Sequence, residues 1–132
     1  MKKGKFEFTS HTANLASMRT FVRTFLNDYP FSDKERALIV LGVDEACTNI
    51  IRYAYDLRDD QPIRLSMEAL RNCIRVRLRD YGAPISRALK ALTSNQPKTG
   101  GRGIQLMRNV FDRVDYMYKP RGTELVLTKN LN

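Results

Sequence analysis

The segment IRLSMEALRNCIRVRLRD, residues 63–80, carries the clearest strand pattern in this chain. Apolar and polar residues alternate on both sides of a turn at residues 70–72, which predicts an antiparallel hairpin with one buried face. Asp80 falls on the inward face by the same period of two, and a buried carboxylate is costly unless it meets a hydrogen-bond donor. An adenine amino group is one such donor. The alternative is an Asp that turns the chain and caps the following loop.

The outward positions of the hairpin carry a row of arginines: Arg64, Arg75, Arg77 and Arg79. Most rows of this kind are solvated faces of a sheet. The alternative is a docking surface for an acidic partner, and charge alone does not choose between the two.

A long amphipathic helix is predicted before the hairpin. Ser32 and Glu35 form a capping box that begins it, and an apolar arc farther along should face the core. Glu45 and Asn49 lie one turn apart outside that arc, together with Gly42. A carboxylate there can orient or deprotonate a hydroxyl, and an amide oxygen suits Mg²⁺. The alternative for this pair is a solvated polar face.

A short strand and a further helix are expected upstream. Residues 5–9 alternate weakly and predict the strand. Ser10 or Thr12 can cap the helix, whose apolar positions recur at helical spacing until Tyr29 and Pro30 end it.

A glycine-rich turn is predicted downstream at residues 100–103, after an irregular segment at residues 83–99. Its free amides and the helix that it opens favour phosphate, whereas a plain loop is the alternative. The turn follows a loop rather than a strand and lacks the GxxxxGK[ST] pattern, so it is neither a Rossmann fingerprint nor a P-loop.

Two closing strands are expected at residues 113–119 and 123–129, and Thr123 shares its inward face with Leu125 and Leu127. The order β-α-α-β-β-α-β-β lacks the regular alternation of a doubly wound fold. It predicts an α+β fold in one domain over residues 1–132. We expect a two-layer sandwich, with a mostly antiparallel, mixed sheet and helices packed on one face.

Composition indicates a globular cytoplasmic protein. The 132 residues are 42% hydrophobic, and no apolar run is long enough for a membrane span or a secretion signal. Cys47 and Cys73 lack CxxC spacing and are interpreted as reduced thiols. The net charge of +9 suggests acidic partners. The basic residues form no single run, which argues against direct nucleic-acid binding.

Four motifs in order resemble the GHKL ATPase superfamily: Glu45-x-x-x-Asn49, Asp80-x-Gly82, Gly101-x-Gly103 and Gly122-Thr123. Within it, VDEACTNIIRYAY (residues 43–55) and GGRGIQL (residues 100–106) look like the anti-sigma-factor serine/threonine protein kinases, which are stand-alone histidine-kinase-like ATPase domains. The resemblance covers about residues 8–127. Tyr53 departs from it, because the subfamily usually has histidine there.

This resemblance implies the Bergerat fold, with ATP and Mg²⁺ as ligands. Glu45 would be the catalytic base and Asn49 the Mg²⁺ ligand. Asp80 would hydrogen-bond the adenine, and Gly82 would line its pocket. Residues 83–99 would be a lid over the nucleotide. The phosphates would be contacted by Gly101, Arg102 and Gly103, and Thr123 would close the adenine side.

The implied function is phosphorylation of an anti-sigma-factor antagonist, combined with binding of a sigma factor in a partner switch. A non-catalytic module that holds ATP to stabilise a partner-binding surface is the alternative, and Glu45 favours the kinase because a pure binder does not need that carboxylate. A nucleic-acid-binding domain would rest on charge alone. A homodimer is left open.

Overall fold

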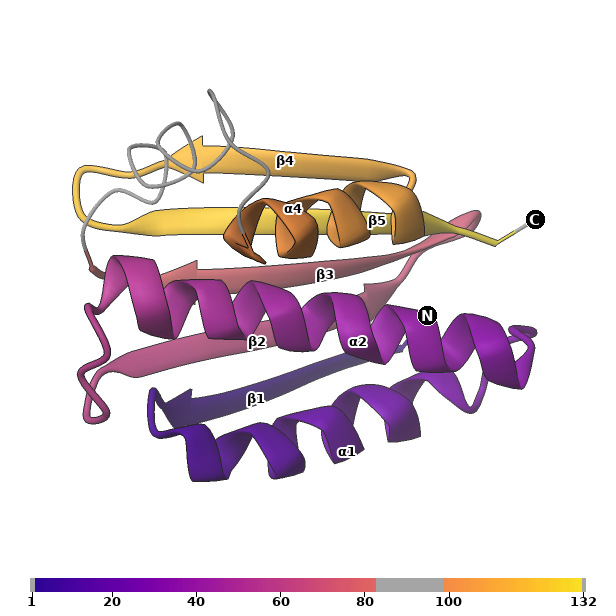
Figure 1. The fold of residues 1–132 in the computed structure, drawn as a ribbon. Helices are drawn as coiled ribbons and strands as arrows, with labels where there is room; N and C mark the ends of the chain where they lie inside the picture. Colours follow the sequence, from indigo (N-terminus) through magenta and orange to yellow (C-terminus); the bar gives the residue numbers. More distant parts are fainter. Residues whose placement is uncertain (1, 83–98, 132) are drawn as a thin grey trace.

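The structure, a computed structural model, describes residues 2–82 and 99–131. Five strands form one sheet, and the helices cover one face of it, so the described chain has two layers (Figure 1). The sheet order is β1-β2-β3-β5-β4, and the strands are β1 (Lys3–Thr9), β2 (Pro62–Ala69), β3 (Cys73–Asp80), β4 (Arg113–Tyr118) and β5 (Thr123–Asn130). The α+β sandwich with helices on one face is therefore confirmed.

The expected mixed character of the sheet is not found, since every neighbouring pair of described strands is antiparallel. β4 does run parallel to β3, because both pair antiparallel with β5. The closing hairpin places β5 between them, however, so the parallel strands never become neighbours.

In the described residues, three α-helices make the second layer: α1 (Leu15–Leu26), α2 (Asp33–Asn49) and α4 (Thr99–Val110). A short 3₁₀ turn, η1 (Thr12–Asn14), precedes α1, and a π-helical turn, η2 (Ile50–Ala54), continues α2. No helix in the described residues combines the length and apolar character that crossing a membrane requires.

The start of the first helix differs from expectation. His11 caps η1, its Nδ1 accepting a hydrogen bond from the Ala13 amide at 2.9 Å. Ser10 is instead a buried link between loops. Its hydroxyl donates to the Arg58 carbonyl at 2.5 Å and accepts from the Gln61 amide at 3.1 Å.

The start of α2 confirms the capping box. The Ser32 hydroxyl accepts from the Glu35 amide at 3.1 Å, and the Glu35 carboxylate accepts from the Ser32 amide at 2.9 Å. Gly42, expected outside the core-facing arc, is buried, and a Cβ there would lie 2.8 Å from the Phe111 ring. The arc predicted one core-facing side of the helix, whereas α4 and Phe111 after it also pack against α2 on the side of Gly42.

The central hairpin faces as its alternation predicts. Six inward apolar side chains are at most 1% exposed: Ile63, Leu65, Met67, Ile74, Val76 and Leu78. Cys47 and Cys73 are free thiols, and burial raises the pKa of Cys47. The core therefore lies between the inner face of the sheet and the helices α1, α2 and α4.

Candidate functional site

The ends of four secondary-structure elements lie at one end of the two layers (Figure 1). The C-terminal end of α2, the end of β3, the start of β5 and the start of α4 lie there. Each of the predicted motifs sits on one of these ends. The fold thus gathers residues that are far apart in the sequence.

Asp80 and Thr123 are direct cross-strand partners at this end, and each is 1% exposed. One Asp80 carboxylate oxygen accepts from the Gly82 amide at 3.0 Å. Burial raises the pKa of Asp80, although the hydrogen bond from Gly82 acts against this. The Thr123 hydroxyl has no hydrogen-bond partner in the described residues. The predicted inward orientation of both side chains is confirmed, and their pairing makes a buried polar patch on a largely apolar face.

Asn49 ends α2 and is 4% exposed, so it is not part of a solvated polar face. Its amide nitrogen is buried without a hydrogen-bond partner among the described residues. Glu45 lies one turn earlier on the same helix and is half-buried. A buried amide that is left without a partner costs free energy, so a ligand that contacts it would recover part of that cost.

Tyr55 braces the site, a role that the sequence analysis did not assign. Its side chain is fully buried after η2, and its hydroxyl donates to the Pro62 carbonyl at 2.5 Å and accepts from the Tyr81 amide at 2.8 Å. It therefore ties the segment after Asn49 to the end of β3. The one signal in the sequence is an aromatic residue at the end of a mostly apolar segment, residues 50–55.

Two glycines let the chain pass close to itself beside Asp80. A Cβ at Gly82 would overlap the Ala54 carbonyl oxygen and lie 2.8 Å from the Tyr55 ring. Gly122 has a φ of 82°, and a Cβ there would overlap the Asp80 carbonyl oxygen. Both positions thus need glycine for packing. The adenine-lining role of Gly82 remains a prediction.

Arg79 supports the same residues from the outer face of the sheet. Its guanidinium donates to the Asp80 carbonyl, and to the Thr123 carbonyl at 3.5 Å. The alternation of β3 predicts only that Arg79 points outward. Its role depends on a neighbour 44 positions away, which no local pattern predicts.

The phosphate-side residues fall differently from expectation. α4 begins at Thr99, so Gly101, Arg102 and Gly103 lie inside the start of the helix rather than in a turn before it. The first four amides of an α-helix have no partner within the helix, so the start of α4 still offers N–H groups. The predicted lid lies outside the described residues, except for Thr99.

A metal ion would need ligands beyond those that the described protein supplies. The described residues contain no group of three or more His, Cys, Asp and Glu side chains placed to hold a metal ion. The Asn49 side chain can supply one oxygen. This fits Mg²⁺, which often takes one or two protein ligands and completes its shell with phosphate and water.

Comparison with known proteins identifies the family. A family model of the histidine kinase-like ATPase domain matches residues 8–129. An anti-sigma F factor of Clostridium beijerinckii is 27% identical over 136 residues, which cover 98% of this chain and 95% of that protein. The anti-sigma F factor of Bacillus subtilis is also 27% identical, and the alignment covers 96% of this chain and 90% of that protein. The serine/threonine-protein kinase BtrW of Bordetella bronchiseptica is 26% identical, and the alignment covers 76% of this chain and 74% of that protein.

Solved structures share the fold at lower identity. The RsbU and RsbW domains of a Mycobacterium tuberculosis protein match with a TM-score of 0.71 at 16% identity, over 99% of this chain and 32% of that one. The histidine kinase domain of a blue-light activated kinase from Erythrobacter litoralis matches with a TM-score of 0.60 at 18% identity, over 90% of this chain and 60% of that one. The motifs, the fold and the family model agree, and the chain belongs to the histidine kinase-like ATPase domain family.

Proposed function

We propose that this chain is a cytoplasmic anti-sigma-factor-type serine/threonine protein kinase, which binds ATP with Mg²⁺, phosphorylates an anti-sigma-factor antagonist and binds a sigma factor. The observation that carries the proposal is a pair of buried polar atoms without partners in the described residues. One belongs to Asn49 at the end of α2, and the other belongs to Thr123, the cross-strand partner of Asp80. The relatives named anti-sigma F factor and serine/threonine-protein kinase support the choice of reaction.

The adenine would be recognised at the cross-strand pair. Asp80 is a buried acceptor on a largely apolar face of the sheet, and an adenine amino group is a matching donor. Thr123 lies directly across and can add a hydroxyl that donates or accepts. Guanine presents a carbonyl at the corresponding position, so we expect GTP to bind poorly.

The phosphates would lie between α2 and the start of α4. Free amides at the start of α4 favour negative charge. Asn49 would hold Mg²⁺, which neutralises charge on the phosphates when it is bound. The chain itself then contributes mainly position and electrostatic stabilisation, as is usual in phosphoryl transfer.

Transfer itself would use Glu45 as the base. The hydroxyl oxygen of an antagonist serine or threonine bonds to the γ-phosphorus, and the bond from that phosphorus to the β,γ-bridging oxygen breaks. The hydroxyl proton passes to the Glu45 carboxylate, and ADP leaves. Glu45 is half-buried one helical turn before Asn49, which places the base beside the proposed metal ligand.

Single-turnover transfer from labelled ATP to a small antagonist protein tests the proposal. Removal of general-base assistance costs about 10²–10⁴-fold in rate, so Glu45→Ala should transfer far more slowly. It should retain ATP affinity, because the carboxylate acts on the hydroxyl and not on the nucleotide. Equilibrium ATP binding is measured on the same samples.

Asp44→Asn is the matched control, because it removes a carboxylate from the same helix. Asp44 forms an ion pair with Arg19 of α1 at 3.0 Å, which assigns it to helix packing. Transfer should continue in this variant. Unchanged transfer in Glu45→Ala would exclude Glu45 as the base, and ATP binding without any transfer by the unmodified protein would leave a nucleotide-binding module.

A further inference from the structure

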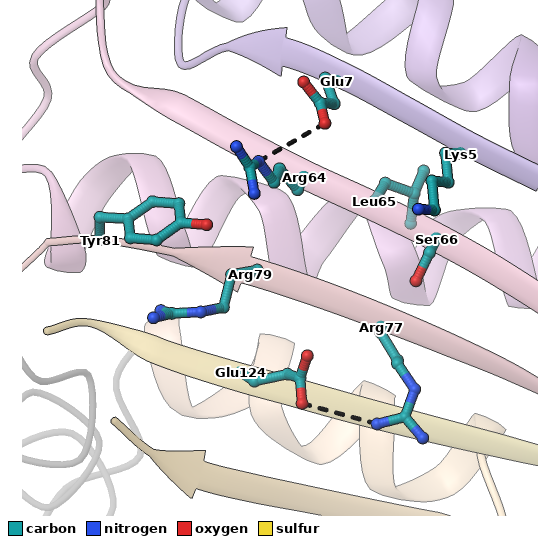
Figure 2. Close-up of a pocket in the computed structure, with 9 residues that line it drawn as sticks. All are labelled: Lys5, Glu7, Arg64, Leu65, Ser66, Arg77, Arg79, Tyr81 and Glu124. Carbon is teal, nitrogen blue, oxygen red and sulfur yellow. Dashed lines mark ion pairs between the residues drawn. The ribbon is translucent and has the colours of Figure 1, made fainter. Parts of the chain in front are cut away.

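The outer face of the sheet, opposite the helices, carries a groove that the proposed kinase chemistry does not use. Figure 2 shows it with the side chains projecting from β1, β2, β3 and β5 and the helices behind the sheet. Its volume is about 310 Å³. We define the arginine groove by Lys5, Arg64, Arg77, Arg79 and Tyr81, which line it.

Positive charge exceeds negative charge in the arginine groove. Its four basic side chains share the lining with only two carboxylates, those of Glu7 and Glu124. The Arg64–Glu7 and Arg77–Glu124 ion pairs each span 3.5 Å. Within the described chain, Lys5 and Arg79 have no carboxylate within ion-pair distance, so the groove keeps uncompensated cations.

The register of the sheet concentrates this charge. Arg64 and Arg79 are direct cross-strand partners, and like charges at such positions are destabilising. The Tyr81 ring lies near both guanidinium groups, with its centroid 5.7 Å from Arg64 Cζ and 4.2 Å from Arg79 Cζ. An anion bound between the two arginines would relieve their repulsion.

We propose that the arginine groove docks an acidic segment of a partner protein in an extended conformation. Arginine binds carboxylate with two parallel hydrogen bonds, and Arg64 keeps most of its side chain exposed, 59%. Arg77 and Arg79 are two positions apart on β3, which spaces their side chains by about 7 Å. Alternate side chains of an extended peptide have the same spacing.

The chemistry favours a protein segment over nucleic acid. A phosphate backbone would meet the interspersed carboxylates of Glu7 and Glu124, whereas a peptide can place its own acidic residues between them. Base stacking would need a free aromatic face, and the Tyr81 ring already contacts guanidinium groups. A second copy of this chain would bring the same excess of positive charge to the contact.

A fluorescein-labelled hexaglutamate peptide, followed by anisotropy at low salt, is the probe. Arg64→Glu should weaken binding roughly fivefold or more, because it turns an attractive charge into a repulsive one. Arg113→Glu is the matched control: it makes the same charge change on the same sheet, Arg113 also pairs with a carboxylate (Asp115, 3.4 Å), and its side chain is 72% exposed. This control should change affinity less than twofold. Lys5→Glu is a second groove variant in case Arg64→Glu does not fold.

Excess Mg²⁺-ATP should not displace the peptide, because the groove and the nucleotide site lie on opposite faces. Displacement by ATP, or equal losses in Arg64→Glu and Arg113→Glu, would overturn the proposal. So would a duplex DNA that binds more tightly than the peptide and depends on Arg64. Sedimentation that shows Arg64→Glu dissociating a dimer would instead assign the groove to a second copy. Failure of kinase transfer alone would leave the docking proposal intact.

Discussion

The two faces of the sheet carry polar residues under opposite conditions. On the outer face, charged side chains alternate along the strands and pair across them, as Arg75 and Arg77 do with Glu68. On the inner face, Asp80 and Thr123 form a buried polar pair at one end of a largely apolar surface. A charge costs little where water reaches it and much where water does not. Polarity on the inner face therefore points to a ligand more strongly than the larger charge outside.

The largest effect is expected from an inward residue of β3. Leu78 faces inward and is fully buried, so Leu78→Ala should lower the free energy of unfolding by about 2–5 kcal/mol through lost contacts and a cavity. Urea unfolding followed by circular dichroism measures it. A loss below about 1 kcal/mol would mean that the inner face is not the tightly packed one.

Asp80→Asn sharpens the contrast within the inner face. The variant should weaken ATP binding by about 1–3 kcal/mol, the cost of spoiling a buried hydrogen bond to a charged acceptor. Calorimetry with ATP and GTP measures the affinity and the preference for adenine. Equal affinity of the unmodified protein for both nucleotides would remove Asp80 from adenine recognition.

Without nucleotide, the same variant should become more stable relative to the unmodified protein as the pH rises. Burial raises the pKa of Asp80 in the folded protein, so the protonated carboxyl stabilises the fold at low pH. That contribution is lost as the pH rises from the unfolded value, about 4, through the folded-state pKa. Unfolding measured from pH 4 to 7 should therefore favour Asp80→Asn over the unmodified protein increasingly toward neutral pH. A difference that stays constant across this range would show that the carboxylate is already compensated in the empty site.

The smallest effect is expected on the outer face. Arg77→Ala should change the free energy of unfolding by no more than about 1 kcal/mol, since its ion pairs with Glu68 and Glu124 are partly solvated. Urea unfolding beside Leu78→Ala gives the comparison in one series. A loss as large as that of Leu78→Ala would mean that the outer face is part of the folding core.

The sequence predicted those features that follow from a local period. The inward position of Asp80 and the capping box of Ser32 needed only the alternation of a strand and the geometry of a helix start. The burial of Gly42 and Asn49 was missed because one apolar arc records one packed side of the helix, and α2 also packs against α1 and α4. The backbone hydrogen bonds of Arg79 join strands that no short pattern connects.

The order of the strands was also beyond local reasoning. Element types predicted two layers, and parity predicted which side of each strand is buried. The second strand of the closing hairpin, β5, could lie at the edge of the sheet or between β3 and β4, and packing of the whole domain determines which. Because β5 lies between them, β3 and β4 are not neighbours, and no parallel neighbours form among the described strands.

The π turn η2 sets a limit on the length of the chain between Asn49 and Tyr55. Backbone hydrogen bonds in a π turn span five residues instead of the four of an α-helix, and such turns are frequent at functional sites. Deletion of a single residue here would let α2 continue regularly and rotate Tyr55 by about 100° about the helix axis. The Tyr55 hydroxyl would then leave the Pro62 carbonyl and the Tyr81 amide, and the end of β3 would lose its tie to the helix. Members of this family should consequently tolerate substitutions in the turn far better than changes in its length.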